Sequence, residues 1–296
     1  MSEVRVAMLV SRVRVEEKLI LGAFARRGHD VEVVDVRALM VDTHGQLPGW
    51  DVVLDRCVQQ SHALAALRLF EDRGVATVNT PRVVANCADK VVTTSLLVAA
   101  GVAVPRTIVA FSVDGALAAI ESVGYPAVVK PPVGSWGRLL ARVNDRDAAE
   151  ALLDHKATLG SVAHQVFYVQ EHVAKPGRDI RAFVAGGEVI CAIDRLSDHW
   201  ITNTARGATT VNRPVTAAIA DVTLRAAAAV GGGVLAVDLL EDGERLLVSE
   251  VNHTMEFRNS VDVTGVDIAG RIAAHTVDSV RNAGAQQPAV LAAVSA

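Results

Sequence analysis

Aromatic side chains are scarce in this 296-residue chain and make up only 4% of it. Proteins that bind nucleic acids usually stack bases on aromatic side chains and gather lysine and arginine on one face. Here the formal net charge is −4, and residues of both signs are dispersed along the chain. These two features argue against a nucleic-acid partner.

Paired cysteines and long apolar runs are also missing. Cys57, Cys87 and Cys191 are widely spaced and form no CxxC pair, which argues against a disulfide framework or a zinc site. No apolar run approaches the ~20 residues that a membrane-spanning helix needs. The first residues, "MSEVRVAMLVSR", lead directly into a strand pattern without the features of a secretion signal. We therefore expect a cytoplasmic protein with no membrane partner.

The apolar content of 51% is sufficient for about two or three packed units in a chain of this length. The N-terminal part alternates between strands and helices, which is typical of a parallel βαβ unit. The strands are expected at 4–10, 30–36, 50–57 and 75–79, and the helices at 16–28 and 61–74. No GxGxxG follows the first strand, so we do not expect a nicotinamide site there.

The rest of the chain predicts antiparallel hairpins and helices. Helices are expected at 82–102 (one or two), 112–124, 145–160, 216–231 and 265–283. Strands are expected within 105–110, 125–143, 166–195 and 234–251, and "AVGGGV" (229–234) is interpreted as a flexible joint. The segment 196–214 is expected to be a long loop. We divide the chain into domains at 1–83, 84–165 and 166–284, followed by a flexible tail at 285–296.

Lys130 ends an apolar strand in "VVKPPVGSWGR" and is followed by Gly134, Gly137 and Arg138. Burying a lysine is costly unless an anion compensates its charge. Glycines let backbone N–H groups approach phosphate oxygens closely. The pattern therefore fits a phosphate site, and an ordinary hairpin with a surface lysine is the alternative.

Asp179 and Arg181 are two residues apart in the strand pattern "GRDIRAF" and so point to the same face. They could hold a ribose hydroxyl and a phosphate, although the local pattern alone favours an ion pair of little energetic value. The polar segment that follows contains Arg195, Asn203 and Arg206. Long loops inside compact domains are usually functional or disordered.

Asp238 interrupts the apolar strand "VLAVDLL", and Glu250 and Asn252 end the next strand. Carboxylate and amide oxygens are typical ligands of Mg²⁺. A two-residue turn at Asp242 and Gly243 would place Asp238 on the face opposite to Glu250. A magnesium site therefore requires a bulged or odd-length hairpin that pairs Asp238 with Val248 and brings these side chains to one face.

Taken together, these features resemble the ATP-grasp superfamily. The segments "KPGRDIRAFV", "HWITNTARG", "GGGVLAVDLLED" and "EVNHTMEFRNSVDVTGVDIAG" are similar to ligases that join an amino acid to an amino-group carrier protein. These ligases form the LysX-type branch of the family that contains the ribosomal-protein glutamate ligases. The resemblance covers residues 4–283. It implies an α/β (α+β) ATP-grasp fold with a Rossmann-like N-terminal domain, and ATP held between the other two domains.

The resemblance also implies a role for particular residues. ATP would be bound by Lys90, Lys130, a phosphate loop (Gly134, Ser135, Trp136, Gly137, Arg138), an adenine-binding segment (Gln170, Glu171, His172, Val173), Asp179 near the ribose, and Arg181. Mg²⁺ would be held by Asp238, Glu250 and Asn252. Catalytic contacts to phosphate or carboxylate would come from Arg195, Asn203 and Arg206. The amino-acid site would include Arg195 and Asn203 and be lined by Glu256, Phe257, Arg258, Asn259 and Ser260.

The implied reaction joins the side-chain carboxylate of the terminal glutamate of a small acidic carrier protein to the α-amino group of 2-aminoadipate or glutamate through an acyl phosphate. The resemblance places it in lysine- or arginine-type amino-acid biosynthesis. We also expect a homo-oligomer. Three alternatives remain open. The first is addition of glutamate to a protein tail or peptide, and the second is a related ligase of specialised metabolism. The third is a nucleotide-binding regulator without catalysis, which would lack metal ligands. The branch commonly has a tyrosine where this chain has Asp194, which leaves the accepted amino acid open.

Overall fold

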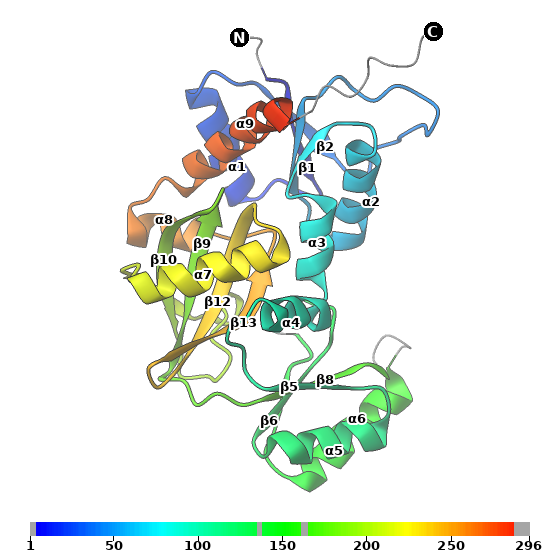
Figure 1. Ribbon diagram of the computed structural model, residues 1–296, viewed down its shortest axis with the longest axis vertical. Helices are drawn as coiled ribbons and strands as arrows, with labels where there is room; N and C mark the ends of the chain where they lie inside the picture. The colour runs from blue at the N-terminus through cyan, green and yellow to red at the C-terminus, as the bar shows by residue number, and fades with distance from the viewer. Residues whose placement is uncertain (1–3, 135–137, 161–164, 287–296) are drawn as a thin grey trace.

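The computed structural model describes residues 4–134, 138–160 and 165–286. Within these ranges the chain forms a parallel four-stranded sheet, an antiparallel four-stranded sheet and a five-stranded sheet, with helices packed against each (Figure 1). No helix of the described ranges is long and apolar enough to cross a membrane.

The N-terminal sheet has the strand order β2-β1-β3-β4, and all its pairs are parallel. Its strands are β1 (Val6–Val10), β2 (Val31–Asp35), β3 (Val52–Arg56) and β4 (Ala76–Val78). Every residue of β1 and β3 is buried, because α1 (Val15–Arg26) and α9 (Ile268–Gln286) cover one face and α2 (Gln60–Glu71) covers the other. The predicted βαβ unit is confirmed. Figure 1 shows that its second covering helix, α9, comes from the other end of the chain.

Two short helices connect this sheet to the rest of the molecule. Thr80 caps α3 (Pro81–Ala88), and the side chain of Asp89 caps α4 (Lys90–Ala99) by accepting a hydrogen bond from Val91 N. Two helices are therefore present where one or two were predicted. The predicted domain boundary after residue 83 falls within α3.

The central sheet has the order β5-β8-β6-β7 and is antiparallel. Its strands are β5 (Thr107–Ala110), β6 (Ala127–Lys130), β7 (Ala141–Val143) and β8 (Phe167–Glu171). Alternate residues such as Val129 and Val169 pack against α5 (Val113–Val123) and α6 (Arg146–Leu159). The residues between them, including Lys130 and Gln170, therefore point to the opposite face.

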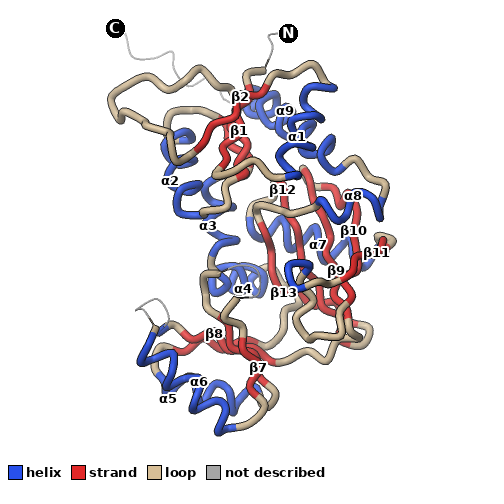
Figure 2. Tube along the Cα trace, turned by 180° about the vertical axis from the view of Figure 1, so that it is seen from behind, coloured by secondary structure: helices blue, strands red, loops and turns tan. Residues whose placement is uncertain are grey.

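The five-stranded sheet has the order β11-β10-β9-β12-β13. Its strands are β9 (Arg178–Ala185), β10 (Glu188–Leu196), β11 (Thr209–Arg213), β12 (Val234–Asp242) and β13 (Arg245–Asn252). One face packs against α7 (Ala217–Val230). The apolar half of the other face, including Phe183 and Ala236, joins the core beneath α9, whereas its charged half carries Asp179 and Asp238. Figure 2 shows these strands side by side.

The structure corrects three details of the prediction. The segment 196–214 is not all loop, because Thr204–Arg206 form a 3₁₀ turn and Thr209–Arg213 form β11 on the edge of the sheet. A short helix that was not predicted, α8 (Arg258–Thr264), precedes α9. Its first turn has no side-chain cap that would have indicated where it begins. Finally, α9 continues to Gln286, into the segment predicted as a tail. The first two elements are short and largely polar, so their periodicity is weak.

Candidate active site

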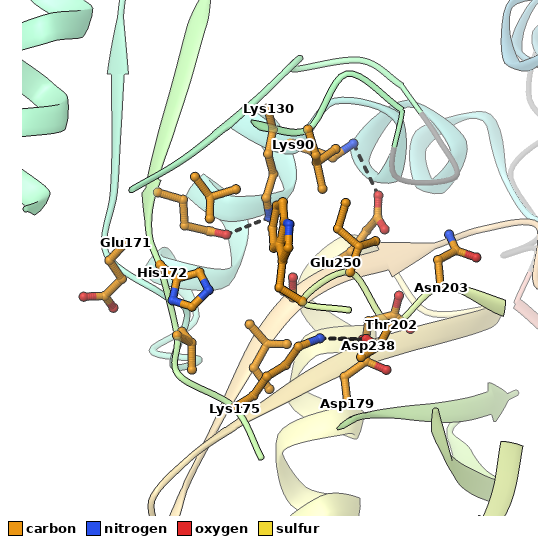
Figure 3. A pocket seen from close by; sticks show the side chains of 18 of the residues that line it. Lys90, Lys130, Glu171, His172, Lys175, Asp179, Thr202, Asn203, Asp238 and Glu250 are labelled. Carbon is orange, nitrogen blue, oxygen red and sulfur yellow. Dashed lines mark hydrogen bonds and ion pairs between the residues drawn. The ribbon is translucent and has the colours of Figure 1, made fainter. Parts of the chain in front are cut away.

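The main cavity lies between the polar face of the central sheet and the charged face of the five-stranded sheet (Figure 3). The central sheet and α4 contribute Lys130 and Lys90, and the five-stranded sheet contributes acidic residues opposite them. Most residues predicted for ATP line this cavity: Lys90, Lys130, Gly134, Gln170, Glu171, His172, Val173 and Asp179. Predicted metal and catalytic residues join them: Asp238, Glu250, Arg195 and Asn203. Ser135, Trp136 and Gly137 lie outside the described residues, and Arg138 is exposed.

The β12–β13 hairpin has the bulge that the sequence required. Leu239 pairs with Val248, but Asp238 pairs with Glu250, so Ser249 has no partner in the ladder. Because directly opposed residues point to the same face, both carboxylates face the cavity, and Asn252 follows two residues later on the same face. The expected bulge and the common face of these side chains are confirmed. The expected pairing of Asp238 with Val248 is wrong, because the two-residue turn lies at Gly243 and Glu244 and Val248 pairs with Leu239.

Four charged side chains of alternating sign cover this face. Arg181 donates to both oxygens of Asp238 at 2.7 and 2.8 Å. Arg195 donates to both oxygens of Asp179 at 2.6 and 2.8 Å and also lies 3.1 Å from Asp238 Oδ2. Burial alone would raise the pKa of Asp238, but the two guanidinium groups outweigh it and lower this pKa to about 2. The group is therefore a fixed anion with two fixed cations beside it.

Asp179 has little capacity left for a ribose. Besides Arg195, its carboxylate accepts a hydrogen bond from Thr202, and Lys175 Nζ lies 3.6 Å away. Lys175 also donates to Thr202 at 2.6 Å. Asp179 therefore holds Arg195 in place and ties the loop at Thr202 to β9, while the predicted ribose contact stays a prediction.

Lys130 is a buried cation at the end of β6. Its Nζ donates to Gln170 Oε1 at 2.7 Å, and the Gln170 amide nitrogen donates in turn to Thr107 and Tyr168 at 3.1 Å. Burial lowers the pKa of Lys130 to about 8, although Glu250 acts in the opposite direction. The side chain of Gln170 thus orients Lys130. An adenine base in this cavity would therefore contact the backbone of the residues that follow Gln170, because the Gln170 side chain is occupied.

Lys90 approaches the hairpin from the other side of the cavity. Its Nζ lies 3.3 Å from Glu250 Oε1 and donates to the carbonyl of Gly134 at 2.7 Å. Figure 3 shows Lys90 and Glu250 facing each other across the space between the two sheets. Lys90 is therefore the ion-pair partner of Glu250 at the edge of the cavity, whereas Asp238 is held by two arginines within the sheet.

The donor set suits a hard cation that also binds phosphate. Among the described residues, no three His, Cys, Asp or Glu side chains are grouped closely enough to hold a metal by themselves. Arg181 and Arg195 take three of the roughly four acceptor positions of Asp238, which leaves one. The buried amide nitrogen of Asn252 has no hydrogen-bond partner within the described part of the chain. Mg²⁺ typically binds one or two carboxylates and completes its shell with phosphate oxygens and water.

Most residues predicted for the amino acid border a second cavity, which shares Arg195 with the first, whereas Asn203 lines the first one instead. It is lined by Arg181, Arg195, Glu256, Arg258, Asn259 and Ser260. Phe257 is a correction, because it is only 1% exposed and packs in the core beneath α9. Its aromatic ring is too apolar to remain at a charged surface when the core is adjacent. Arg206 ends the 3₁₀ turn and is exposed.

Sequence reasoning missed the contribution of the N-terminal domain. Arg12 and Arg14, from the segment between β1 and α1, and Lys18, from the first turn of α1, line the second cavity. Arg14 lies 3.2 Å from Glu256, and Arg258 N donates to Glu16 at 3.3 Å. A usable signal existed, since ligands of α/β sheets bind at the carboxyl ends of strands and "SRVR" follows β1 directly.

Asp194 lies away from both cavities. It precedes Arg195 on β10 and therefore points to the α7 face, where it is 3.5 Å from Arg213 and 4.0 Å from Arg178. Burial raises its pKa despite these two arginines. The residue in which this chain departs from the LysX-type pattern thus makes no direct contact with the site.

Two models of known protein families match most of the chain. Residues 6–86 match the LysX preATP-grasp domain, and residues 87–276 match the RimK-like ATP-grasp domain. The chain belongs to the RimK-like ATP-grasp family. Its fold is similar to the crystal structure of a RimK domain ATP-grasp protein from Sphaerobacter thermophilus, with a TM-score of 0.80 and 30% identity over 92% of this chain and 99% of that one.

Two curated proteins that are similar to this RimK-like chain are named as ligases of LysW. It is 32% identical over 274 residues to the glutamate–LysW ligase ArgX of Sulfolobus acidocaldarius, covering 92% of this chain and 97% of that protein. It is 38% identical over 221 residues to the alpha-aminoadipate–LysW ligase LysX of the same organism, covering 74% and 80%. The predicted fold class, the LysX-type resemblance and the class of enzyme, an ATP-dependent ligase, are confirmed.

Proposed function

We propose that this RimK-like ligase uses ATP and Mg²⁺ to join the side-chain carboxylate of a carrier protein's terminal glutamate to the α-amino group of 2-aminoadipate or glutamate. The observation that carries the proposal is the cavity in which Lys90 and Lys130 face Asp238 and Glu250, with Arg195 beside them. The names of the relatives, which are ligases of LysW with glutamate or alpha-aminoadipate, support the substrate class.

The reaction has two steps. A carboxylate oxygen of the carrier's glutamate attacks the γ-phosphorus of ATP, the bond to the ADP oxygen breaks, and an acyl phosphate forms. The uncharged amino nitrogen of the amino acid then attacks the acyl carbon, inorganic phosphate leaves, and the nitrogen loses a proton. The products are an amide, ADP and phosphate, and no covalent bond to the enzyme is needed.

The residues of the main cavity suit the first step. Lys90 and Lys130 neutralise phosphate charge, and Gln170 keeps Lys130 aimed into the cavity. Asp238, Glu250 and Asn252 would hold Mg²⁺, which would neutralise charge developing on the transferred phosphoryl group. Electrostatic stabilisation of this kind is strongest at sites where the charged groups are already oriented before the substrate binds.

The second cavity suits the second step. Arg195, shared by both cavities, is assigned to the phosphoryl and acyl-phosphate oxygens. Asn203 and Arg206 are assigned to the same intermediate, and Arg258, Asn259 and Ser260 to the amino acid. The acidic carrier would approach this side of the molecule, where arginines outnumber acidic residues.

The test is a phosphate-release screen with the purified enzyme, ATP, Mg²⁺, a purified amino-group carrier protein and single amino acids. We expect phosphate release only when carrier and either 2-aminoadipate or glutamate are both present, with a matching mass increase of the carrier. A carrier truncated by its terminal glutamate is the control and should give none. Phosphate release with glutamate and an unrelated acidic peptide, at the rate seen with the carrier, would instead favour the peptide-tail ligase.

A further inference from the structure

Asn79 connects the N-terminal domain to the hairpin that carries the proposed metal ligands. It follows β4 directly and is 3% exposed. Its amide nitrogen donates to the carbonyl of Val234 at 2.8 Å and to the carbonyl of His253 at 2.7 Å. Its amide oxygen accepts from Val234 N at 2.7 Å. One side chain therefore binds the first residue of β12 and the residue that follows β13.

These contacts lie where the two strands separate. The β12–β13 ladder ends with the pair Ala236 and Asn252, and Val234 is two residues beyond it. A side-chain amide has the same donor and acceptor groups as a peptide unit. Asn79 therefore takes the position of a strand partner for Val234 and links it to His253, so that it closes the open end of the hairpin.

The glycines before β12 make room for this amide. Gly233 has a φ of +101°, and a Cβ atom built on it would lie 2.1 Å from Asn79 Oδ1. A Cβ on Gly231 would lie 2.9 Å from a methyl group of Val83, and Asn86 donates to the carbonyl of Val230 at 2.9 Å. The "AVGGGV" segment, predicted as a flexible joint, is thus held at both ends by the N-terminal domain and α3.

We propose that Asn79 is a positioning residue for the metal-binding end of the β12–β13 hairpin. His253 is adjacent to Asn252 in the chain, so fixing its carbonyl fixes the direction from which the Asn252 amide projects. Val234 is four residues before Asp238 on the same strand. Without Asn79, the backbone groups of Val234 and His253 lose buried partners and the strand ends are free to separate. The proposal rests on the metal assignment made under the proposed function.

The experiment measures metal binding rather than turnover. Mn²⁺ replaces Mg²⁺, and free Mn²⁺ is followed by electron paramagnetic resonance in the full-length enzyme with a non-hydrolysable ATP analogue. We expect Asn79→Ala to weaken Mn²⁺ binding about tenfold, at the lower end of what groups that orient metal ligands contribute. Binding of the nucleotide without metal should stay unchanged. If Asn79→Ala does not fold, Asn79→Ser, which keeps at most part of the contacts, should show a smaller loss in the same direction.

Asn86→Ala is the matched control, because it removes a similar amide-to-carbonyl hydrogen bond made by the same region to α7. We expect it to bind Mn²⁺ like the unmodified enzyme. Equal weakening by Asn79→Ala and Asn86→Ala would mean general loosening and would overturn the proposal. Glu250→Gln distinguishes the positioning role of Asn79 from the assignment of the metal ligands. If it weakens Mn²⁺ binding and the Asn79 variants do not, the positioning role fails and the metal assignment stands. If Glu250→Gln has no effect, the metal assignment itself fails, and the positioning role with it.

Discussion

Asp238 lies directly opposite Glu250 only because Ser249 is excluded from the β12–β13 ladder. The register set by the pair Leu239 and Val248 would otherwise oppose Asp238 to Ser249. Glu250 would then point toward the apolar core beneath α7, because a one-residue shift turns a side chain to the other face. The bulge therefore brings both carboxylates to the face where the cavity lies. Substituting each carboxylate separately tests its role.

Glu250→Gln should abolish most turnover with little change in stability. The substitution keeps the volume but removes one charge from the proposed metal site, and the side chain is 32% exposed. We expect kcat to fall by at least about 100-fold, the loss typical when one stabilising group of a charged transition state is removed. ADP formation at saturating Mg²⁺ measures it. Glu244→Gln, in the exposed turn of the same hairpin, should behave as the unmodified enzyme.

Asp238→Asn should lose turnover and stability together. The carboxylate lies between two guanidinium groups and is 5% exposed, so its neutral replacement leaves Arg181 without its carboxylate partner and leaves Arg195 with Asp179 alone. Breaking a buried ion pair in this way costs about 3–5 kcal/mol. Urea unfolding should therefore give a lower free energy of unfolding for Asp238→Asn than for Glu250→Gln. Equal stability of Asp238→Asn and Glu250→Gln would contradict the ion-pair role of Asp238.

These two carboxylates also show how far sequence reasoning reaches. An aspartate inside "VLAVDLL" requires a partner, and the two-residue periodicity of strands was enough to infer that a bulged or odd-length hairpin must bring it to the same face as Glu250. Its actual partners, Arg181 and Arg195, could not be inferred, because they depend on the order β10-β9-β12 of strands distant in the chain. Pairing order is decided by the packing of the whole sheet and leaves no local signal.

Other parts of the site were beyond sequence analysis for a related reason. Arg14 reaches Glu256 across a separation of 242 residues, and Asn79 reaches His253 across 174. Both contacts join the N-terminal domain to the segment after β13. Helix ends such as Gly28 and Ser112 were predictable, because caps depend on a few neighbouring residues. Contacts between domains depend on how complete surfaces fit together.

ATP binding should weaken as the pH rises above about 8, since burial lowers the pKa of Lys130 to about 8 and phosphate attracts only its charged form. The limiting change is about tenfold in the dissociation constant per pH unit. In the ligand-free protein this lysine has the opposite effect on stability. Between pH 8 and its ordinary pKa of 10.5 the unfolded state binds more protons, so its contribution to stability rises with pH.

Calorimetric titration with ATP at pH values from 7 to 9.5, without carrier, would measure this dependence. Lys130→Arg is the matched variant, because a guanidinium stays charged throughout the range. We expect a flatter pH profile for it, even if its affinity at pH 7 is lower. An unchanged profile in Lys130→Arg would assign the pH dependence to another group.

Arg56→Met should destabilise the fold although Arg56 lines neither of the two cavities. Its side chain is 1% exposed, donates to Glu17 Oε1 at 2.9 Å and reaches the carbonyl of Met255 at 3.1 Å. Removing it leaves both acceptors buried, and Glu17 keeps only Arg14, so we expect a loss of about 3 kcal/mol or more. Arg37→Met is the control. Arg37→Met breaks an ion pair with Asp35 that is shorter, at 2.7 Å, but exposed to solvent. It should therefore leave the free energy of unfolding unchanged.

The last prediction concerns recruitment of the acidic carrier. The enzyme has a formal net charge of −4, so overall attraction cannot bring an acidic protein to it. The second cavity is a local exception, since Arg12, Lys18 and Arg258 are exposed along its rim. Charges at the rim of an interface mainly set the association rate and its dependence on salt. Arg12→Ala and Lys18→Ala should therefore raise KM for the carrier and leave KM for ATP unchanged.

We expect roughly a fivefold increase for each, corresponding to about 1 kcal/mol, the upper end for an exposed ion pair. The dependence of kcat/KM on ionic strength should become shallower in both. Arg146→Ala, on the exposed surface of α6, removes the same charge far from the cavity and is the control for net charge. If Arg146→Ala changes the carrier's KM as much as Arg12→Ala does, recruitment depends on total charge and the second cavity is not the docking side. If the rim variants instead raise KM for ATP and carrier equally, these two basic residues serve the nucleotide.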